Sequence, residues 1–160
     1  MGSIVGIVVV VIGILASVAL HEVGHMLPAK KFGVLVPDYA VGFGPALWKK
    51  KIGDTTYALR AILLGGYVKI VGMYAPARPG TRTLGRGGKP TLAQEAREAS
   101  AEEIPEGQEA RAFYRLSAPK KIAVMLGGPL MNLLICIVLS AVTMIGIGAP
   151  TASRTIADVP

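Results

Sequence analysis

An uncharged run from Ile4 to Leu20 is followed at once by two histidines and a glutamate in the pattern HEVGH, residues 21–25. Met26 and Leu27 then resume the apolar run. About 20 apolar residues are enough to cross a bilayer as a helix. Ionisable groups at membrane depth cost roughly 2.5–3.5 kcal/mol each on insertion scales, so they are rare and usually functional. The segment 4–27 therefore predicts a transmembrane helix that ends in a reactive group of side chains.

A second uncharged run extends from Ile122 to Ile147 and is also long enough to span. The composition agrees, since 52% of residues are hydrophobic and the mean hydropathy is +0.53. A cleaved signal peptide is the alternative for the first run, but no basic region precedes it and no A-x-A site follows it. The predicted fold class is an α-helical membrane protein with two transmembrane helices and a small membrane-associated β region between them.

The net charge of +7 is explained by membrane topology and not by nucleic acid. Nearly every Lys and Arg lies between the two runs. Lys30 and Lys31 directly follow the first run, and Lys120 and Lys121 directly precede the second. The positive-inside rule then places the connecting loop in the cytosol and both termini outside the plasma membrane. Basic groups at this position also meet anionic headgroups, which makes membrane lipid a predicted partner.

The connection between the runs divides into parts of different character. The first helix is expected to stop near Pro28. Residues 34–74 are predicted as β structure, with Gly53-Asp54 as a tight hairpin turn. This region is either an ordinary soluble sheet or a re-entrant hairpin near the motif, where internal pairing lets backbone lie at membrane depth. Residues 75–110 are expected to form a flexible cytosolic linker, in which 92–109 is either a fraying helix or disordered.

The remaining boundaries follow from the second run. Residues 111–148 are predicted to hold a juxtamembrane segment and the second transmembrane helix. Within that helix Asn132 is a polar amide in hydrocarbon and needs a partner. It either bridges the helices or holds a substrate backbone.

The HEVGH pattern has the spacing of a zinc site. On a helix, residues four apart share a face, so His21 and His25 can bind one metal. Zinc accepts imidazole nitrogen and lowers the pKa of a bound water to about 7. Glu22 lies on an adjacent face, suited to take a proton from that water and return it to a leaving amine. Gly24 is expected to leave room beside the metal for a peptide. The lone Cys136 excludes a cysteine-based zinc cluster.

Four blocks together resemble a known family. HEVGH, VGFGP (residues 41–45), LGGYVKIVGM (64–73) and GGPLMN (127–132) are similar, in this order, to motifs of the site-2 proteases. The likeness is strongest to bacterial, particularly actinobacterial, members that cut anti-sigma factors. These are intramembrane zinc metalloendopeptidases that act in regulated intramembrane proteolysis.

The resemblance assigns roles to individual residues. It implies that His21 and His25 are zinc ligands and that Glu22 is the catalytic base. The VGFGP and GGYVK segments would form β structure beside the site, which makes Gly42 and Gly44 candidates for contacting substrate, together with Asn132. The substrate would be a single-span membrane protein that unwinds and pairs with an exposed strand edge.

The resemblance also implies a part that these residues lack. Site-2 proteases take a third zinc ligand from an aspartate in an LDG-type motif on a later span. The aspartates here are Asp38, Asp54 and Asp158, and none lies in such a motif. Residues 149–160 resemble the start of an extracytoplasmic PDZ-like domain. The chain is therefore expected to be the N-terminal portion of a longer protease, incomplete and inactive alone.

Two other classes of function compete with the protease. A truncated or degenerate relative would be a non-catalytic module that binds membrane substrate or lipid. A proton- or metal-coupled transporter would use the same buried His and Glu, but transporters of this kind are commonly built from internal repeats, and no inverted repeat is seen here.

Overall fold

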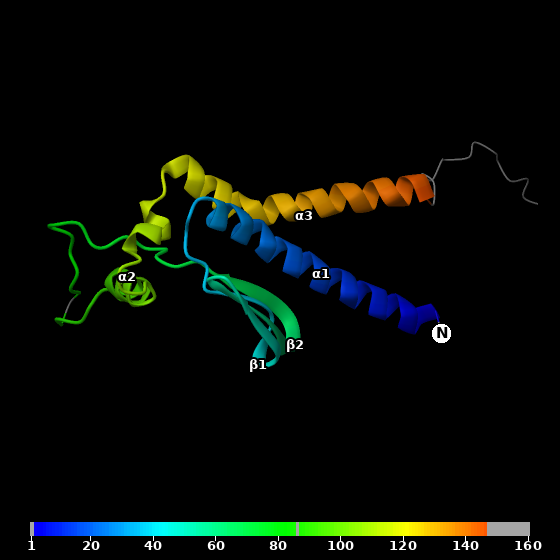
Figure 1. The fold of residues 1–160 in the computed structure, drawn as a ribbon, viewed down its shortest axis with the longest axis horizontal. Coiled ribbons are helices and arrows are strands. Elements are labelled where there is room, and N and C mark those ends of the chain that lie inside the picture. The colour runs from blue at the N-terminus through cyan, green and yellow to red at the C-terminus, as the bar shows by residue number, and fades with distance from the viewer. Residues whose placement is uncertain (1, 86, 147–160) are drawn as a thin grey trace, which may run out of the picture.

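The computed structural model describes residues 2–85 and 87–146, and its core is a pair of long helices with a curled sheet on one side (Figure 1). A short helical region lies at one end of the pair. In chain order the elements are α1 (Gly2–Lys31), β1 (Asp38–Ile52), β2 (Thr55–Lys69), α2 (Leu92–Glu102), the 3-10 turns η1 (Glu109–Arg111) and η2 (Phe113–Arg115), and α3 (Ala118–Gly146).

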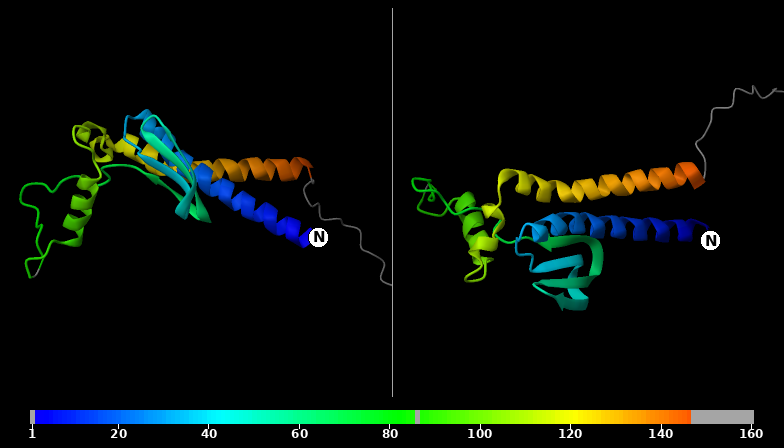
Figure 2. Two further views of the ribbon diagram at one scale, coloured as in Figure 1. Left: turned by 60° about the horizontal axis from the view of Figure 1, so that its bottom comes forward. Right: turned by 45° about the horizontal axis from the view of Figure 1, so that its top comes forward.

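The two long helices lie antiparallel (Figure 2). The C-terminal half of α1 contacts the N-terminal half of α3. Both are long and apolar enough to cross a membrane, as the sequence predicts. Most of their large apolar side chains have no partner among the described residues, and Ile4, for example, is 70% exposed. Soluble monomers rarely expose so much contiguous apolar surface. This exposure favours a lipid environment for the outer surfaces of both helices.

Glycines bring the backbones of α1 and α3 together. A Cβ added to Gly24 would collide with the carbonyl oxygen of Gly127, and a Cβ added to Gly127 would collide with the carbonyl oxygen of Gly24. Small residues at such a contact are typical of membrane helix pairs, where close packing and Cα–H···O contacts replace the hydrophobic effect. The prediction that Gly24 leaves room for a peptide is wrong, because α3 fills that space.

Helix α1 continues through Pro28 to Lys31, so the prediction that it stops near Pro28 is wrong. A proline removes only its own N–H, which would have bonded to the carbonyl of Gly24. That carbonyl faces Gly127 instead. The next turn forms normally, since the N–H of Phe32 donates to the Pro28 carbonyl at 2.9 Å.

The β region is a single antiparallel pair of long strands, and Gly53-Asp54 forms the predicted hairpin turn. Both strands bend at glycines with positive φ, which are Gly42 and Gly44 in β1 and Gly65 in β2. The bend lets residues 38–41 of β1 find partners in both halves of β2, at residues 56–59 and 66–69. The sheet therefore curls on itself, and residues 38–41 have strand partners on both sides.

The curled sheet is fastened to α1 on the side away from α3 (Figure 2). The Tyr39 hydroxyl donates a hydrogen bond to the carbonyl oxygen of Ala19 at 2.9 Å. Gly66 lies so close to α1 that an added Cβ would be 3.3 Å from Val18 and 3.5 Å from the Glu22 Cγ. The sheet is thus positioned directly beside the motif.

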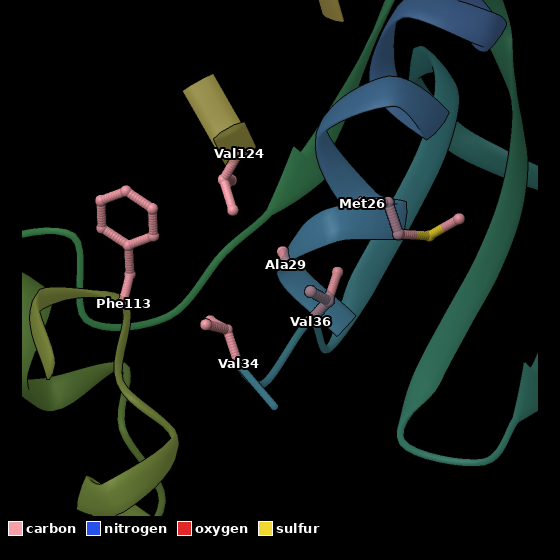
Figure 3. Close-up of a cluster of buried hydrophobic side chains, with 6 residues drawn as sticks. All are labelled: Met26, Ala29, Val34, Val36, Phe113 and Val124. Atoms are coloured by element: carbon pink, nitrogen blue, oxygen red, sulfur yellow. The ribbon is translucent and has the colours of Figure 1, made fainter. Parts of the chain in front are cut away.

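A small hydrophobic cluster holds the end of the helix pair together (Figure 3). It consists of Met26, Ala29, Val34, Val36, Phe113 and Val124. The backbone around Phe113 joins this cluster to the sheet, because its N–H donates to the Val71 carbonyl at 2.9 Å. Arg111 adds an ion pair to Asp54 in the hairpin turn at 2.8 Å. The segment before α3 therefore ties α1, the sheet and α3 into one unit.

Part of the predicted linker 75–110 has regular secondary structure. Residues 92–102 form α2, capped by the Thr91 hydroxyl accepting from the Gln94 N–H, so the helical alternative holds. The Ser100 hydroxyl is buried and accepts a hydrogen bond from the Tyr74 N–H at 3.0 Å. The predicted start of a PDZ-like domain at 149–160 lies outside the described residues.

The glycine contact makes a prediction about stability. Replacing Gly24 with Ala forces α1 and α3 apart, so the unfolding free energy should fall by about 1–3 kcal/mol. A lower melting temperature in detergent measures this loss. Gly13→Ala on the same helix is the matched control, since Gly13 has no atom within 4 Å of an added Cβ. Equal melting temperatures for the two variants would contradict the role of the contact.

Candidate metal centre and active site

His21 and His25 point the same way from α1, as their spacing predicts. Their Nε2 atoms are 3.2 Å apart, and their ring planes are inclined at 79°. Two nitrogens that bind one tetrahedral zinc at its usual bond length lie about 3.3 Å apart. The two imidazoles therefore fit the nitrogen half of a zinc site.

A carbonyl on α3 fixes the orientation of His25. Its Nδ1 lies 2.8 Å from the backbone oxygen of Val124, whose side chain is fully buried. A carbonyl only accepts, so Nδ1 carries the proton and Nε2 keeps its lone pair free. Metal-binding histidines commonly use their second nitrogen in this way. The Nδ1 of His21 is also buried, and it has no hydrogen-bond partner among the described residues.

Gly128 leaves open the space beside both imidazoles. A Cβ at this position would collide with the His25 Nε2 and would lie 2.7 Å from the His21 Nε2. Because Gly128 has only hydrogen there, α3 can pack against the motif without placing a side chain on the two nitrogens. Helix contact and access to the nitrogens thus depend on adjacent glycines, 127 and 128.

Glu22 faces a pocket of about 390 Å³ between α1, the end of β2 and α3. The described residues that line it are Glu22, His25, Val68, Lys69, Ile70, Met73 and Met125. The walls are mainly apolar, whereas Glu22 and His25 bring a carboxylate and an imidazole to the same space. A carboxylate acting on a water next to a metal needs this arrangement.

Tyr39 contributes to the surroundings of Glu22 from the sheet. Burial and then the negative charge of Glu22 raise the pKa of Tyr39, with a smaller contribution from Tyr57. The phenol therefore stays protonated at neutral pH and remains a donor to the Ala19 carbonyl. This hydrogen bond keeps β1 against the helix turn that precedes the motif.

The described residues do not include a group of three His, Cys, Asp or Glu side chains that could hold a metal. Asp54 is paired with Arg111, and Asp38 lies in a separate small pocket of the sheet. Asp158 is outside the described residues. Catalytic zinc sites normally use three protein ligands and a water, so the pair His21 and His25 has the number and spacing of two ligands of such a set.

The other predicted site residues lie apart from this pocket. Gly42 and Gly44 are at the bend of β1, and neither is among the described residues that line the pocket. Asn132 accepts a hydrogen bond from the Ser17 hydroxyl at 3.4 Å, which is the helix-bridging alternative for its amide. Contact of these three residues with substrate stays a prediction.

Three contributors to the site were missed by the sequence reasoning. They are Gly66, Val124 and Lys69, which respectively pack against Glu22, orient His25 and line the pocket. Val124 acts through its backbone, so its side chain gives no signal. Gly66 and Lys69 both lie in the LGGYVKIVGM block that the resemblance singles out, which is the one indication that the sequence offers for them.

Fold and site together place an HExxH motif on a helix, backed by a second helix and flanked by a curled sheet. The sequence matches peptidase family M50 over residues 9–158. The chain belongs to this family, the site-2 proteases, as the resemblance predicts.

Curated relatives are zinc metalloproteases by name. The chain is 38% identical to zinc metalloprotease Rip1 of Mycobacterium tuberculosis over 136 residues, 85% of this chain and 28% of that protein. It is 38% identical to a putative zinc metalloprotease of Chlamydia pneumoniae over 75% of this chain and 16% of the relative. A putative zinc metalloprotease of Clostridium acetobutylicum is 28% identical over 99% of this chain and 38% of its own length. The chain thus spans less than half the length of these relatives.

Gly128 offers a test of the metal centre in the full-length protein. Gly128→Ala places a methyl group against both Nε2 atoms, so zinc affinity should fall roughly tenfold or more, as for other changes that disturb ligand orientation. Competition with a chromogenic chelator measures the affinity. Gly146→Ala on the same helix is the control, because nothing lies within 4 Å of a Cβ there. Unchanged zinc binding by Gly128→Ala would rule out this placement of the site.

Proposed function

We propose that this chain carries the HExxH half of the active site of an intramembrane zinc endopeptidase. Its substrates are single-span membrane proteins such as anti-sigma factors, cut in regulated intramembrane proteolysis. The observation that carries the proposal is the pair of imidazole nitrogens 3.2 Å apart beside a pocket that also holds Glu22. Membership of the site-2 protease family supports it.

The chain's own residues divide the chemistry between them. His21 and His25 would hold zinc, with a third ligand from residues that the structure does not describe. The metal, when bound, lowers the pKa of a water and polarises the carbonyl of the scissile peptide bond. Glu22 accepts a proton from the attacking water and delivers it to the amine that leaves when the C–N bond breaks. The pocket wall is mainly apolar, and electrostatic interactions are stronger in such surroundings than in water.

The substrate must present an extended backbone at this site, because a helix keeps its peptide bonds hydrogen-bonded internally. The curled sheet lies directly beside Glu22 and offers strand segments to which an unwound peptide can add. Gly42, Gly44 and Asn132 remain candidates for such contacts.

Replacing Glu22 with Gln tests the enzymatic proposal. The amide cannot accept the proton, so cleavage of a single-span substrate by the full-length protein in liposomes should fall by at least about a hundredfold. Zinc content, measured by metal analysis, should be unchanged because Glu22 is not a ligand. Glu106→Gln, on an exposed loop, is the control.

Comparison of the wild type with Glu22→Gln and His21→Ala has three outcomes, and each supports a different conclusion. Activity that survives Glu22→Gln contradicts the role of Glu22 as the base. A wild-type protein that binds the substrate without zinc and without cutting it supports the non-catalytic module instead. Zinc and cleavage in the wild type, both lost in His21→Ala, support the protease.

We also propose that α2 and the sheet turn face the cytosol and that both ends of the chain face outward. The antiparallel helices place Lys30, Lys31, Lys120 and Lys121 at one end of the pair, which the positive-inside rule assigns to the cytosol. Anionic lipid headgroups would contact these side chains there.

Cysteine labelling tests this orientation. With Cys136 replaced by Ala, a membrane-impermeant maleimide should label Ser3→Cys in intact cells and should label Leu92→Cys only after the membrane is opened. Both positions are exposed, so accessibility of the side chain itself does not differ. The reverse labelling pattern would contradict the orientation.

A further inference from the structure

The pocket beside Glu22 has one amine at its edge, that of Lys69. This amine forms an ion pair with Glu103, in the segment that follows the sheet. Lys69 is the last residue of β2 and lines the pocket, and among the described lining residues only Lys69 and Glu22 have ordinarily charged side chains. The Lys69 Nζ lies 3.2 Å from the Glu103 Oε1. Their side chains are 38% and 39% exposed, so this ion pair is open to water.

Glu103 belongs to the most acidic part of the chain. Six of the ten acidic residues lie within positions 95–109, which are Glu95, Glu98, Glu102, Glu103, Glu106 and Glu109. The rest of the chain is strongly basic. The acidic segment is held close to the pocket, because the Ser100 hydroxyl bonds to the Tyr74 N–H next to the lining residue Met73.

The ion pair is weak enough to be exchanged. Half-exposed pairs contribute little to stability, since water competes for both charges and both long side chains lose freedom. A carboxylate of a peptide lying in the pocket would offer Lys69 the same partner. The exchange would keep the ammonium paired and release Glu103 to water, so it costs little.

We propose that Lys69 is a specificity-determining residue that pairs with an acidic side chain of the substrate. Glu103 is then an internal competitor that occupies Lys69 until substrate arrives. The preferred substrate has an apolar side chain for the wall formed by Val68, Ile70 and Met125, and a neighbouring Asp or Glu for Lys69. This inference rests on the proposed proteolytic function and names the chemistry of its substrate.

Two single-span substrates that differ at one position near the cleaved bond, Glu or Gln, provide the test. The full-length protein in liposomes should cut the Glu substrate with a KM roughly fivefold lower and a similar kcat, because the ion pair acts on binding. Lys69→Gln should abolish the difference between the substrates. Lys69→Glu should prefer a third substrate that carries Lys at the same position.

Glu103 variants distinguish two roles of this residue, which are competition with substrate for Lys69 and stabilisation of the fold. Glu103→Gln frees Lys69, so the KM for the Glu substrate should fall about two- to fivefold, with no such fall for the Gln substrate. Glu98→Gln is the matched control, since Glu98 lies in α2, which ends just before Glu103, and bonds only to Gln94 among the described residues. The double swap Lys69→Glu with Glu103→Lys restores the ion pair, so a reversed substrate preference there excludes misfolding as the cause.

The outcomes distinguish this inference from the function on which it rests. Equal KM values for the Glu and Gln substrates in an active wild-type protein overturn the role of Lys69 alone. A Lys69→Gln variant that loses both substrates equally assigns Lys69 to the fold and also overturns it. Failure of the wild type to cut any of the substrates, with zinc bound, contradicts the proposed protease function itself.

Discussion

The close contact of α1 and α3 at Gly24 and Gly127 is the constraint on which the site depends. It places α3 near enough for the Val124 carbonyl to reach His25, and it leaves Gly128 opposite the two Nε2 atoms. A larger residue at any of the three glycines would move α3 outward or fill the space beside the nitrogens. The N-terminal half of α1 and the C-terminal half of α3 hardly touch. The short contact at the glycines therefore largely sets the relative position of the two helices. The same glycines therefore determine both the packing of the two helices and the geometry of the candidate metal site.

Pro28 lies near this contact and is compatible with it for a related reason. Pro28 leaves the Gly24 carbonyl without its helical donor, and that oxygen faces Gly127 across the interface. Proline in a membrane helix is tolerated where a neighbouring helix packs against the freed backbone group. The helix can then continue to Lys31, where its last turn joins the hydrophobic cluster around Phe113. The hydrogen bond that Pro28 removes and the close contact between α1 and α3 thus both involve Gly24.

The sequence was sufficient for features that depend on local patterns. Two apolar runs, the HEVGH spacing and the Gly53-Asp54 turn each predicted what the structure shows, because periodicity and turn chemistry act over a few residues. Features set by distant partners were not predictable in this way. The end of α1 at Lys31 depends on α3, and the space around Gly24 is filled by a segment about a hundred positions away. The position of residues 92–103 is set by contacts of Ser100 with Tyr74 and of Glu103 with Lys69, both distant in the sequence.

The curled sheet explains how backbone can lie beside a membrane helix without a large penalty. Residues 38–41 are paired on both sides, so the part of β1 nearest to α1 has few free backbone groups. Several side chains around the bend of the sheet are apolar and exposed, and Leu64 is 84% exposed. In the membrane orientation proposed above, these side chains face lipid while Lys69 remains at the watery end of the same strand. Strand β2 therefore joins an apolar surface to the charged edge of the pocket. A peptide that leaves the bilayer would pass from the first to the second.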